Sequence, residues 1–285
     1  MTKTIFEAYN DCKKELESAG IEDYVFESKQ IIKHVTGYSN AQILSKYNER
    51  LTEFQQNNMT AIIKQRLVHY PLQYIMCEWG FYGREFSVGP GVLVPRQDSE
   101  TVIDVALERL GEKQEADVLD LCAGTGCLGI TVAAERPYTT VTLVEKYPEA
   151  ATYIYKNIRK NDVPNTRVIE GDIFECPAAD EKFDIIISNP PYVSASEMEK
   201  LPPEVRFEPD TALYGGEDGL LFYRAITSGY RASLKSGGFL IFEIGEEQGE
   251  AVSEILKANG FKDVGIRKDA AGNDRVVFGT AVDVQ

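Results

Sequence analysis

The sequence is poor in the residues on which several classes of protein depend. Its 285 residues include five cysteines and two histidines. An odd number of scattered cysteines without a C-x-x-C pair argues against a disulfide framework and against a structural zinc site. They are Cys12, Cys77, Cys122, Cys127 and Cys176. We therefore expect a reduced, cytoplasmic protein that holds no metal.

Long apolar runs are also missing. No segment approaches the roughly 20 apolar residues that a membrane-spanning helix needs, and the N-terminus has no signal-peptide core. Hydrophobic residues still make up 43% of the chain, which is enough for a substantial core. A chain of 285 residues suits one large or two ordinary domains. The sequence thus predicts no association with a membrane.

Positive charge is scarce. Thirty Lys and Arg residues face 45 Asp and Glu residues, which gives a net charge of −15. Proteins that bind nucleic acids neutralise phosphates with Lys and Arg. The balance therefore argues mildly against a direct nucleic acid partner, although it does not exclude a local basic patch. It fits a small cationic ligand or a protein substrate better.

Residues 1–75 have the pattern of a small all-α domain. Apolar residues recur at helical spacing from Ile5 to Leu16. Thr52 and Gln55 form a capping-box pattern, and Pro71 is expected to end the helix that follows. No chemical motif stands out here, so we predict a docking role rather than catalysis.

Residues 76–97 are predicted to form a β-hairpin linker. Gly89-Pro90-Gly91 is a turn signal, and apolar residues lie on both sides of it. Asp98 is expected to cap the next helix.

From residue 117 onward, strand and helix patterns alternate, which predicts a mostly parallel sheet with helices on both faces. The last two strands leave no room for a helix between them, so they should form an antiparallel hairpin through Ala271-Gly272-Asn273. We take residues 98–285 as one α/β domain. Its expected strands are 117–122, 140–145, 166–170, 183–188, 238–244, 262–268 and 274–280, and its expected helices are 127–135, 148–160, 219–234 and 246–258.

The tetrapeptide Asn189-Pro190-Pro191-Tyr192 follows the apolar strand 183–188. Ligands of open α/β sheets bind at the carboxyl ends of the strands. The Asn189 side chain and the carbonyls of Asn189 and Pro190 are a set of acceptors that could hold an –NH2 group, and Tyr192 offers a flat face. Pro-Pro alone more often marks an ordinary turn.

A glycine-rich loop follows the first strand of the sheet. It runs from Asp120 through Cys122, Ala123, Gly124 and Thr125 to Gly126, and a helix comes next. Gly124, Gly126 and Gly129 have the G-x-G-x-x-G spacing of a dinucleotide site. Methyl-donor sites use a similar turn, so the loop alone leaves the cofactor open.

Two further strand ends carry acidic residues. Glu145 ends the second strand, where a carboxylate can bind ribose hydroxyls. Asp172 follows the third strand and could accept a hydrogen bond from an adenine amino group, with Ile173 packed on the purine. The simpler interpretations are a surface glutamate and a helix cap.

With these residues together, the chain resembles the class I S-adenosylmethionine-dependent methyltransferases, and more narrowly the release factor glutamine N5-methyltransferases. The resemblance covers the whole chain. It includes Val94-Pro95-Arg96, the loop from Asp120 to Gly126, the Asn-Pro-Pro-Tyr tetrapeptide, Glu208-Pro209, Gly215-Gly216-Glu217-Asp218-Gly219-Leu220, and Glu243-Ile244-Gly245 with Gln248. The chain departs from the family pattern at Cys122-Ala123, at Glu145 in place of the commoner Asp, and at Gln97.

The resemblance implies a Rossmann-like methyltransferase sheet of seven mostly parallel strands with an antiparallel C-terminal hairpin, preceded by the small all-α domain as the substrate-recognition part. It implies S-adenosyl-L-methionine as cofactor and, as substrate, the glutamine of the Gly-Gly-Gln motif in peptide chain release factors. The implied cofactor-binding residues are Asp120, Cys122, Ala123, Gly124, Thr125, Gly126, Glu145, Asp172, Ile173 and Asn189.

The expected mechanism is alignment rather than acid–base chemistry. The Asn189 side-chain oxygen and the Pro190 carbonyl would accept both N–H bonds of the substrate amide, and Tyr192 would pack on its plane. Asn189, Pro190, Pro191 and Tyr192 are thus the predicted substrate-binding residues, and Asn189, Pro190 and Tyr192 the catalytic ones. The stretch from Glu208 to Leu220 is expected to close over the substrate.

Three other functions fit parts of the pattern. The same acceptors would hold an exocyclic amine of adenine or guanine in DNA or RNA. A nucleotide-binding module without activity would leave Asn189 and Tyr192 without a purpose. Hydride transfer with NAD would leave the Asn-Pro-Pro-Tyr turn unexplained.

Overall fold

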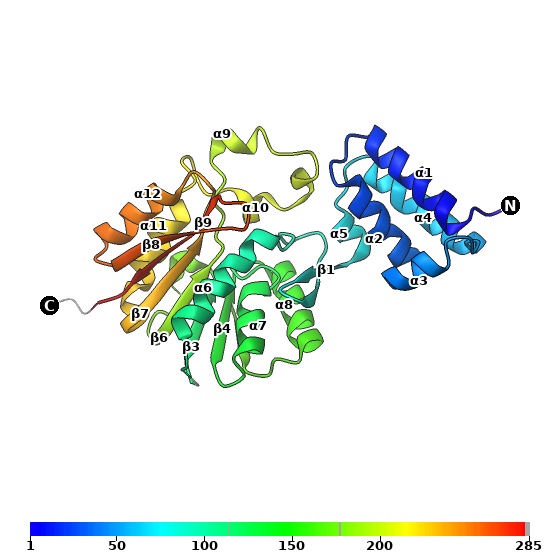
Figure 1. Cartoon of the computed structure of the whole chain (residues 1–285). Helices are drawn as coiled ribbons and strands as arrows, with labels where there is room; N and C mark the ends of the chain where they lie inside the picture. Colours follow the sequence, from blue (N-terminus) through cyan, green and yellow to red (C-terminus); the bar gives the residue numbers. More distant parts are fainter. Residues whose placement is uncertain (114, 177, 283–285) are drawn as a thin grey trace. The chain divides into compact units, whose positions relative to one another are not determined.

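The structure is a computed structural model that describes residues 1–113, 115–176 and 178–282. The chain forms two compact units, and Figure 1 labels most of their helices and strands. The first consists of Met1–Cys77 and Pro203–Phe207, and the second of Glu78–Pro202 and Glu208–Gln285. In the described ranges, no helix is both long and apolar enough to cross a membrane.

The first unit is all-α, as predicted. Capping boxes at Thr4, Ser39 and Thr52 start three of its helices, and the one at Thr52 confirms the sequence pattern. Ile5, Cys12 and Leu16 of the apolar set along residues 5–16 are buried in its core, whereas Phe6 is 52% exposed. The helices are α1 (Ile5–Ser18), α2 (Tyr24–Thr36), α3 (Asn40–Ser45), α4 (Glu53–Arg66) and α5 (Leu72–Met76).

A buried guanidinium ties the first unit together. The Arg66 side chain is 1% exposed, and its nitrogens lie 2.8 and 2.9 Å from the two carboxylate oxygens of Glu27. A third contact, 3.1 Å long, reaches Glu204 in the segment Pro203–Phe207. Phe207 of the same segment packs edge-on against Tyr70, with ring centroids 5.3 Å apart. A buried cation is tolerated when it is paired in this way, so these contacts hold the segment in the helical unit.

The second unit contains a seven-stranded sheet with the order β5-β4-β3-β6-β7-β9-β8. β9 runs antiparallel to both β7 and β8, and the other pairs are parallel, which confirms the predicted fold class. The strands are β3 (Asp117–Leu121), β4 (Thr140–Glu145), β5 (Thr166–Glu170), β6 (Phe183–Ser188), β7 (Leu234–Glu243), β8 (Lys262–Lys268) and β9 (Asp274–Thr280).

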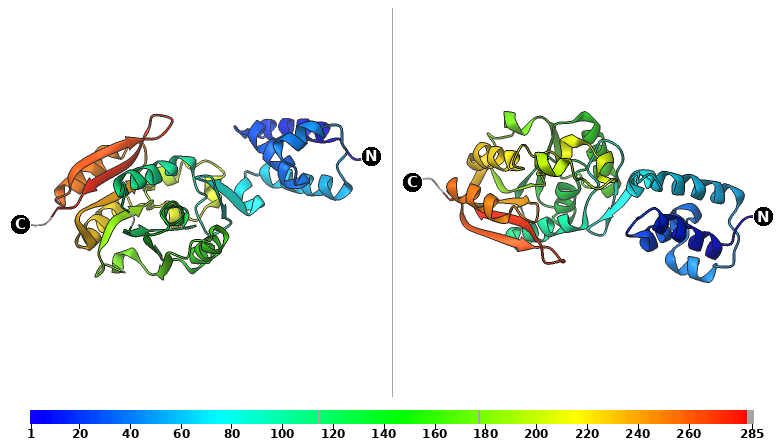
Figure 2. Two further views of the ribbon diagram at one scale, coloured as in Figure 1. Left: turned by 60° about the horizontal axis from the view of Figure 1, so that its bottom comes forward. Right: turned by 90° about the horizontal axis from the view of Figure 1, so that it is seen from above.

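Alternation along the central strands supplies two cores. Val118 and Ile185 belong to one hydrophobic cluster, whereas Leu119 and Ile186 belong to the other. The first is covered by α6 (Glu100–Leu110), α7 (Cys127–Glu135) and α8 (Pro148–Asn161), and the second by α11 (Leu221–Tyr230) and α12 (Gly249–Ala258). Figure 2 shows these helices beside the sheet from two further directions.

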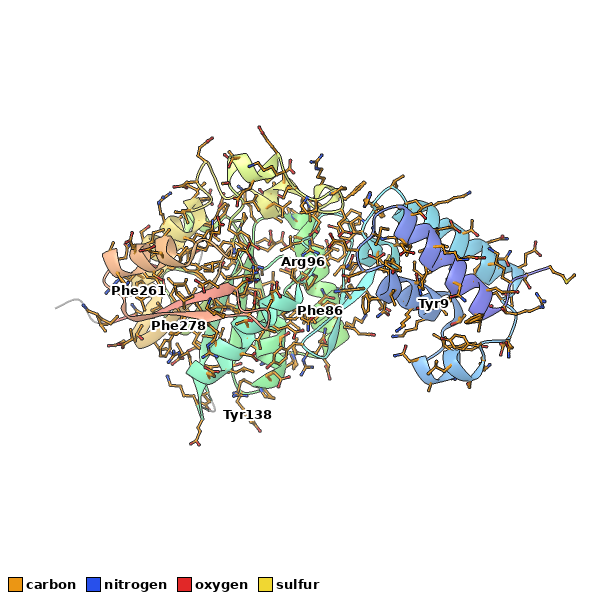
Figure 3. All side chains as sticks on the ribbon, turned by 45° about the horizontal axis from the view of Figure 1, so that its top comes forward. Tyr9, Phe86, Arg96, Tyr138, Phe261 and Phe278 are labelled. Atoms are coloured by element: carbon orange, nitrogen blue, oxygen red, sulfur yellow. The ribbon has the colours of Figure 1, made fainter. Side chains whose placement is uncertain are left out.

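The hairpin predicted within residues 76–97 is present, but its turn is elsewhere. It consists of β1 (Glu78–Phe81) and β2 (Arg84–Ser87), so the hairpin turn is at Tyr82-Gly83. Gly89-Pro90-Gly91 also forms a turn, with the Val92 amide 3.4 Å from the Gly89 carbonyl, but that turn lies after the hairpin. Phe86 of β2, labelled in Figure 3, is fully buried and packs edge-on against Phe81. Short elements complete the chain: η1 (Gln97–Ser99), η2 (Ile173–Glu175), α9 (Ala195–Met198), η3 (Val205–Phe207), α10 (Asp210–Leu213) and η4 (Arg231–Ser233).

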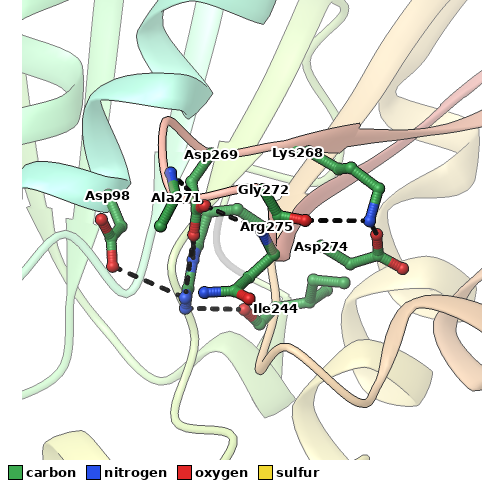
Figure 4. A network of polar contacts seen from close by, with 9 residues as sticks. Asp98, Ile244, Lys268, Asp269, Ala271, Gly272, Asp274 and Arg275 are labelled. Carbon is green, nitrogen blue, oxygen red and sulfur yellow. Dashed lines mark hydrogen bonds and ion pairs between the residues drawn. The ribbon is translucent and has the colours of Figure 1, made fainter.

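Asp98 does not cap a helix, contrary to the prediction. It lies within η1, the N-cap of α6 is Ser99, and no side-chain hydrogen bond caps that helix. The Asp98 carboxylate lies 3.5 Å from the Arg275 guanidinium instead. Figure 4 shows that Arg275 also contacts Asp269 and the Ile244 carbonyl, which anchors the predicted β8–β9 hairpin to the end of β7.

Asp184 anchors the edge of the sheet opposite the strands' carboxyl ends. Its carboxylate accepts hydrogen bonds from Lys113 at 2.9 Å, from Lys235 at 2.7 Å and from the Asp117 backbone at 2.9 Å. Burial alone would raise the pKa of Asp184, but these donors outweigh it and lower the pKa to about 2. The charged form is therefore favoured in the folded state.

We expect Asp184→Asn to lose at most about 2.5 kcal/mol of unfolding free energy at pH 7, since one pKa unit corresponds to about 1.4 kcal/mol. Because the folded pKa is depressed, this stabilisation is present above the unfolded pKa. It should disappear as the pH falls through about 2. Urea unfolding of both proteins between pH 7 and pH 2 measures it, with the exposed Asp180→Asn as control. A difference that persisted at pH 2 would contradict the role given to these ion pairs.

Candidate active site

A cavity opens at the carboxyl ends of β3, β4, β5 and β6, within the second unit. The sequence predicted a site at this edge, and the residues that follow all four strands contribute to the cavity wall. Predicted site residues that line it are Cys122, Ala123, Gly124, Thr125, Glu145, Asp172, Ile173, Asn189 and Pro191. Predicted site residues outside the lining are Asp120, Gly126, Pro190 and Tyr192.

The glycine-rich loop turns through left-handed backbone conformations. Cys122, Gly124 and Gly126 have φ of 60°, 56° and 79°. Glycine adopts such angles freely, whereas a side chain such as that of Cys122 costs roughly 1–2 kcal/mol. Cys122 still fits the turn, and the neighbouring Ala123 amide donates to the Val144 carbonyl at 3.0 Å. Burial raises the pKa of the Cys122 thiol, so it stays protonated.

Asp120 shapes this loop from behind the cavity. Its carboxylate is 1% exposed, and Oδ2 accepts the Gly129 amide at 2.8 Å. Among the described residues, Oδ1 has no partner. Burial raises the pKa of Asp120 to about 7, and the negative charge of Glu145 acts in the same direction. Asp120 therefore fixes the start of α7 in this structure rather than facing the cavity.

Glu145 at the end of β4 faces the cavity and holds two backbone amides. Oε2 accepts from Gly124 at 2.8 Å and Oε1 from Tyr147 at 2.9 Å. Burial raises its pKa, and these two amides act against that rise. Each carboxylate oxygen can accept a further hydrogen bond, so both remain able to bind neighbouring hydroxyl groups.

Asp172 fits both interpretations that the sequence left open. Its Oδ1 caps η2 by accepting the Phe174 amide at 3.1 Å, and its Oδ2 lies 2.8 Å from Lys146. Burial would raise the pKa of Asp172, but these two contacts lower it. Ile173, which is 5% exposed, lies beside it in the cavity wall. An acceptor and an apolar surface are thus adjacent, as a purine ring would require.

Asn189 brings an amide into the cavity wall directly after β6. No described residue makes a hydrogen bond to its side chain. Tyr192, three residues later, is instead packed beside the second core, where burial raises its pKa, and the charge of Glu243 adds to the rise. The Asn-Pro-Pro-Tyr turn therefore presents Asn189 to the cavity and anchors Tyr192 away from it.

A further part of the cavity wall comes from residues to which the sequence alone assigned no individual role. Arg96, Ser99, Pro209, Thr211 and Ala212 contribute to it. Glu208, 4% exposed, accepts the Val94 amide at 2.9 Å and pairs with Arg96, which is labelled in Figure 3. The only available signal was the family pattern at Val94-Pro95-Arg96 and Glu208-Pro209, because the ion pair spans 112 positions.

Two known protein families match separate parts of the chain. Residues 7–76 match the PrmC N-terminal domain and residues 96–202 the methyltransferase small domain. Among solved structures, a methyltransferase from Pyrococcus furiosus has a TM-score of 0.51 at 19% identity, covering 71% of this chain and 91% of that chain. The T. thermophilus 16S rRNA N2 G1207 methyltransferase, in complex with AdoMet and guanosine, has a TM-score of 0.51 at 22% identity and covers 71% of this chain and 49% of that one. These likenesses show a methyltransferase fold.

Similarity to curated proteins extends over nearly the whole chain. The release factor glutamine methyltransferase of Thermodesulfovibrio yellowstonii is 37% identical over 88% of this chain and 91% of its own length. That of Salmonella typhimurium is 34% identical over 87% and 89%, and that of Vibrio cholerae 31% identical over 98% and 97%. The chain belongs to the release factor glutamine methyltransferase family.

Proposed function

We propose that this protein transfers a methyl group from S-adenosyl-L-methionine to the side-chain amide nitrogen of a glutamine in a peptide chain release factor. The observation that carries the proposal is Asn189, which lines the cavity and whose side chain has no hydrogen bond to any described residue. Family membership supplies the reaction type and the substrate class. We expect the substrate to be the glutamine of the Gly-Gly-Gln motif, and we place the reaction in the cytoplasm.

The residues around the cavity fit a nucleoside cofactor. Glu145 keeps lone pairs for ribose hydroxyls beyond its bonds to Gly124 and Tyr147. Asp172 and Ile173 offer an acceptor beside an apolar surface. The loop from Cys122 to Thr125 presents backbone to the same space. We propose that these residues hold S-adenosyl-L-methionine, with Asp120 and Gly126 shaping the loop. When bound, this group supplies a methyl carbon already activated by a sulfonium.

The chain's own contribution is to orient the substrate amide. An amide nitrogen is a poor nucleophile because its lone pair is delocalised into the carbonyl. If the Asn189 side-chain oxygen and the Pro190 carbonyl accept its two N–H bonds, the nitrogen is fixed and positive charge that develops on it is stabilised. The methylated nitrogen then releases one of its two protons to solvent. Pro191 lines the cavity, and Tyr192 anchors the turn. We further propose that Pro209, Thr211 and Ala212 close the site over the substrate.

The three parts of the chain have separate proposed roles. We propose that the helical domain, residues 1–75, recognises the release factor, that residues 76–97 link it to the rest, and that residues 98–285 perform the transfer. Support comes from the match of residues 7–76 to the PrmC N-terminal domain and from the cavity being confined to the second unit.

A methyl-transfer assay tests the substrate. The protein is incubated with labelled S-adenosylmethionine and, in separate reactions, with a release factor, its Gly-Gly-Gln variant with alanine for glutamine, DNA and RNA. We expect label in the intact release factor only. Label in nucleic acid would favour an amino-group methyltransferase of adenine or guanine. Cofactor binding without label in any substrate would point to a binding module.

A further inference from the structure

The side chain of Gln248, at the N-terminus of α12, is hydrogen-bonded on both sides of its amide. Oε1 accepts the Gly245 amide at 3.0 Å, and the Tyr223 hydroxyl lies 3.3 Å away. Nε2 donates to the Tyr192 carbonyl at 3.0 Å and to the Gly219 carbonyl at 3.4 Å. A backbone amide only donates and a carbonyl only accepts, so these partners fix the orientation of the side-chain amide.

The Tyr192 and Gly219 carbonyls belong to two segments that are separated in the sequence but pack against each other. The Val193 amide donates to Leu213 and the Gly215 amide to Val193, both at 2.8 Å. A Cβ atom on Gly215 would lie 2.7 Å from the Pro191 oxygen and 2.7 Å from the Tyr192 Cα. The backbones are therefore in direct contact, and Gln248 joins the end of β7 to them. We call Gln248 and its bonds to Tyr192, Gly219 and Gly245 the clasp.

We propose that Gln248 is a positioning residue for methyl transfer, because the clasp sets the angle at which Asn189 faces the cavity. Only Pro190 and Pro191 separate Asn189 from Tyr192. Proline fixes φ, so these two residues absorb little of a displacement of the Tyr192 carbonyl and transmit it to Asn189. The Tyr223 hydroxyl, which also donates to the Glu243 carbonyl at 2.9 Å, connects the clasp to the sheet. The inference rests on the proposed function.

Gln248→Glu separates this role from simple packing. Glutamate keeps the length and the oxygen that accepts from Gly245, but it loses both donors and turns a carboxylate oxygen toward two carbonyls. We expect kcat to fall at least tenfold while the Kd for S-adenosylmethionine, measured by calorimetry, stays within about threefold. Glu247→Gln, the reverse change at an exposed neighbour, should leave both values unchanged.

A second variant covers the case in which Gln248→Glu does not fold. Gly219 has a φ of 72°, and a Cβ there would overlap the Tyr192 carbonyl oxygen and lie 2.7 Å from Gln248 Nε2. Gly219→Ala therefore opens the clasp from its other side while residue 248 remains a glutamine. It should show the same loss of kcat with retained cofactor affinity.

Hydrogen exchange tests the clasp without any substrate. The Val193 and Gly215 amides should exchange faster in Gln248→Glu than in the unmodified protein, while amides of β3 remain protected. If the unmodified protein methylates no release factor, the proposed function fails, and the exchange rates still decide about the clasp. Unchanged kcat, unchanged exchange, or a loss of cofactor affinity as large as the loss of rate would each overturn the inference.

Discussion

Asn189→Ala should lower the rate of methyl transfer about a hundredfold or more and leave cofactor binding nearly intact. The alanine removes the acceptor that we propose for one substrate N–H bond, and deleting one such preorganised group typically costs 10²–10³ in rate, or at least about 2.7 kcal/mol of barrier. The side chain has no hydrogen bond within the described residues that its loss would break. The folded structure should therefore tolerate the change.

Single-turnover rates with saturating cofactor, together with calorimetric binding of S-adenosylmethionine, measure this separation. Asn161→Ala is the matched control. Its side chain bonds backbone carbonyls of Glu85 and Asn157, away from the cavity. Turnover of Asn189→Ala close to that of the unmodified protein would remove the basis of the proposed mechanism. A parallel loss of cofactor affinity would assign Asn189 to cofactor binding instead.

Glu145→Ala should weaken S-adenosylmethionine binding by tenfold to a hundredfold, which corresponds to about 1.4–2.7 kcal/mol. The change removes the proposed ribose contact. It also leaves the amides of Gly124 and Tyr147 without the carboxylate that holds them at 2.8 and 2.9 Å. Hydrogen bonds to charged groups contribute about 1.5–3 kcal/mol each, so part of the loss comes from a looser loop.

Calorimetric titration with S-adenosylmethionine measures the affinity of Glu145→Ala. Glu175→Ala removes the same charge from an exposed position in η2, so it should bind the cofactor like the unmodified protein. Equal weakening in both variants would point to a general effect of negative charge. An unchanged Kd for Glu145→Ala would place the ribose elsewhere.

Most elements of the sheet could be predicted from local patterns. Strand 183–188 is buried along its length and mostly apolar apart from Asp184 and Ser188, and the prolines that follow it mark its end. The hairpin turn was misplaced because Gly89-Pro90-Gly91 is the stronger local signal. The actual turn uses Tyr82 at a φ of 49°. Tertiary contacts stabilise it there, since the Tyr82 amide donates to Glu100 at 2.7 Å and its hydroxyl to Asp104 at 2.9 Å.

The site was predictable where its chemistry sits at strand ends. Glu145 is the last residue of β4, and Asn189 directly follows β6. The topology therefore brings both residues to the edge of the sheet where these strands have their carboxyl ends. Contacts between distant segments left no periodic signal. The bond from Gln248 to Tyr192 spans 56 positions and that from Arg66 to Glu204 spans 138. Asp120 and Tyr192 were expected to face the ligand, whereas packing places both outside the cavity wall.

The place of residues 203–207 bears on how this enzyme can be dissected. A shortened protein beginning at Glu78 would retain Glu204 and Phe207 but would lack Arg66 and Tyr70, to which they are bound. The excised piece would thus carry a loose stretch of chain immediately before Glu208, whose carboxylate holds Val94 and Arg96. Loss of activity in the shortened protein would then reflect a disturbed cavity wall as well as the loss of the recognition role that we propose for residues 1–75.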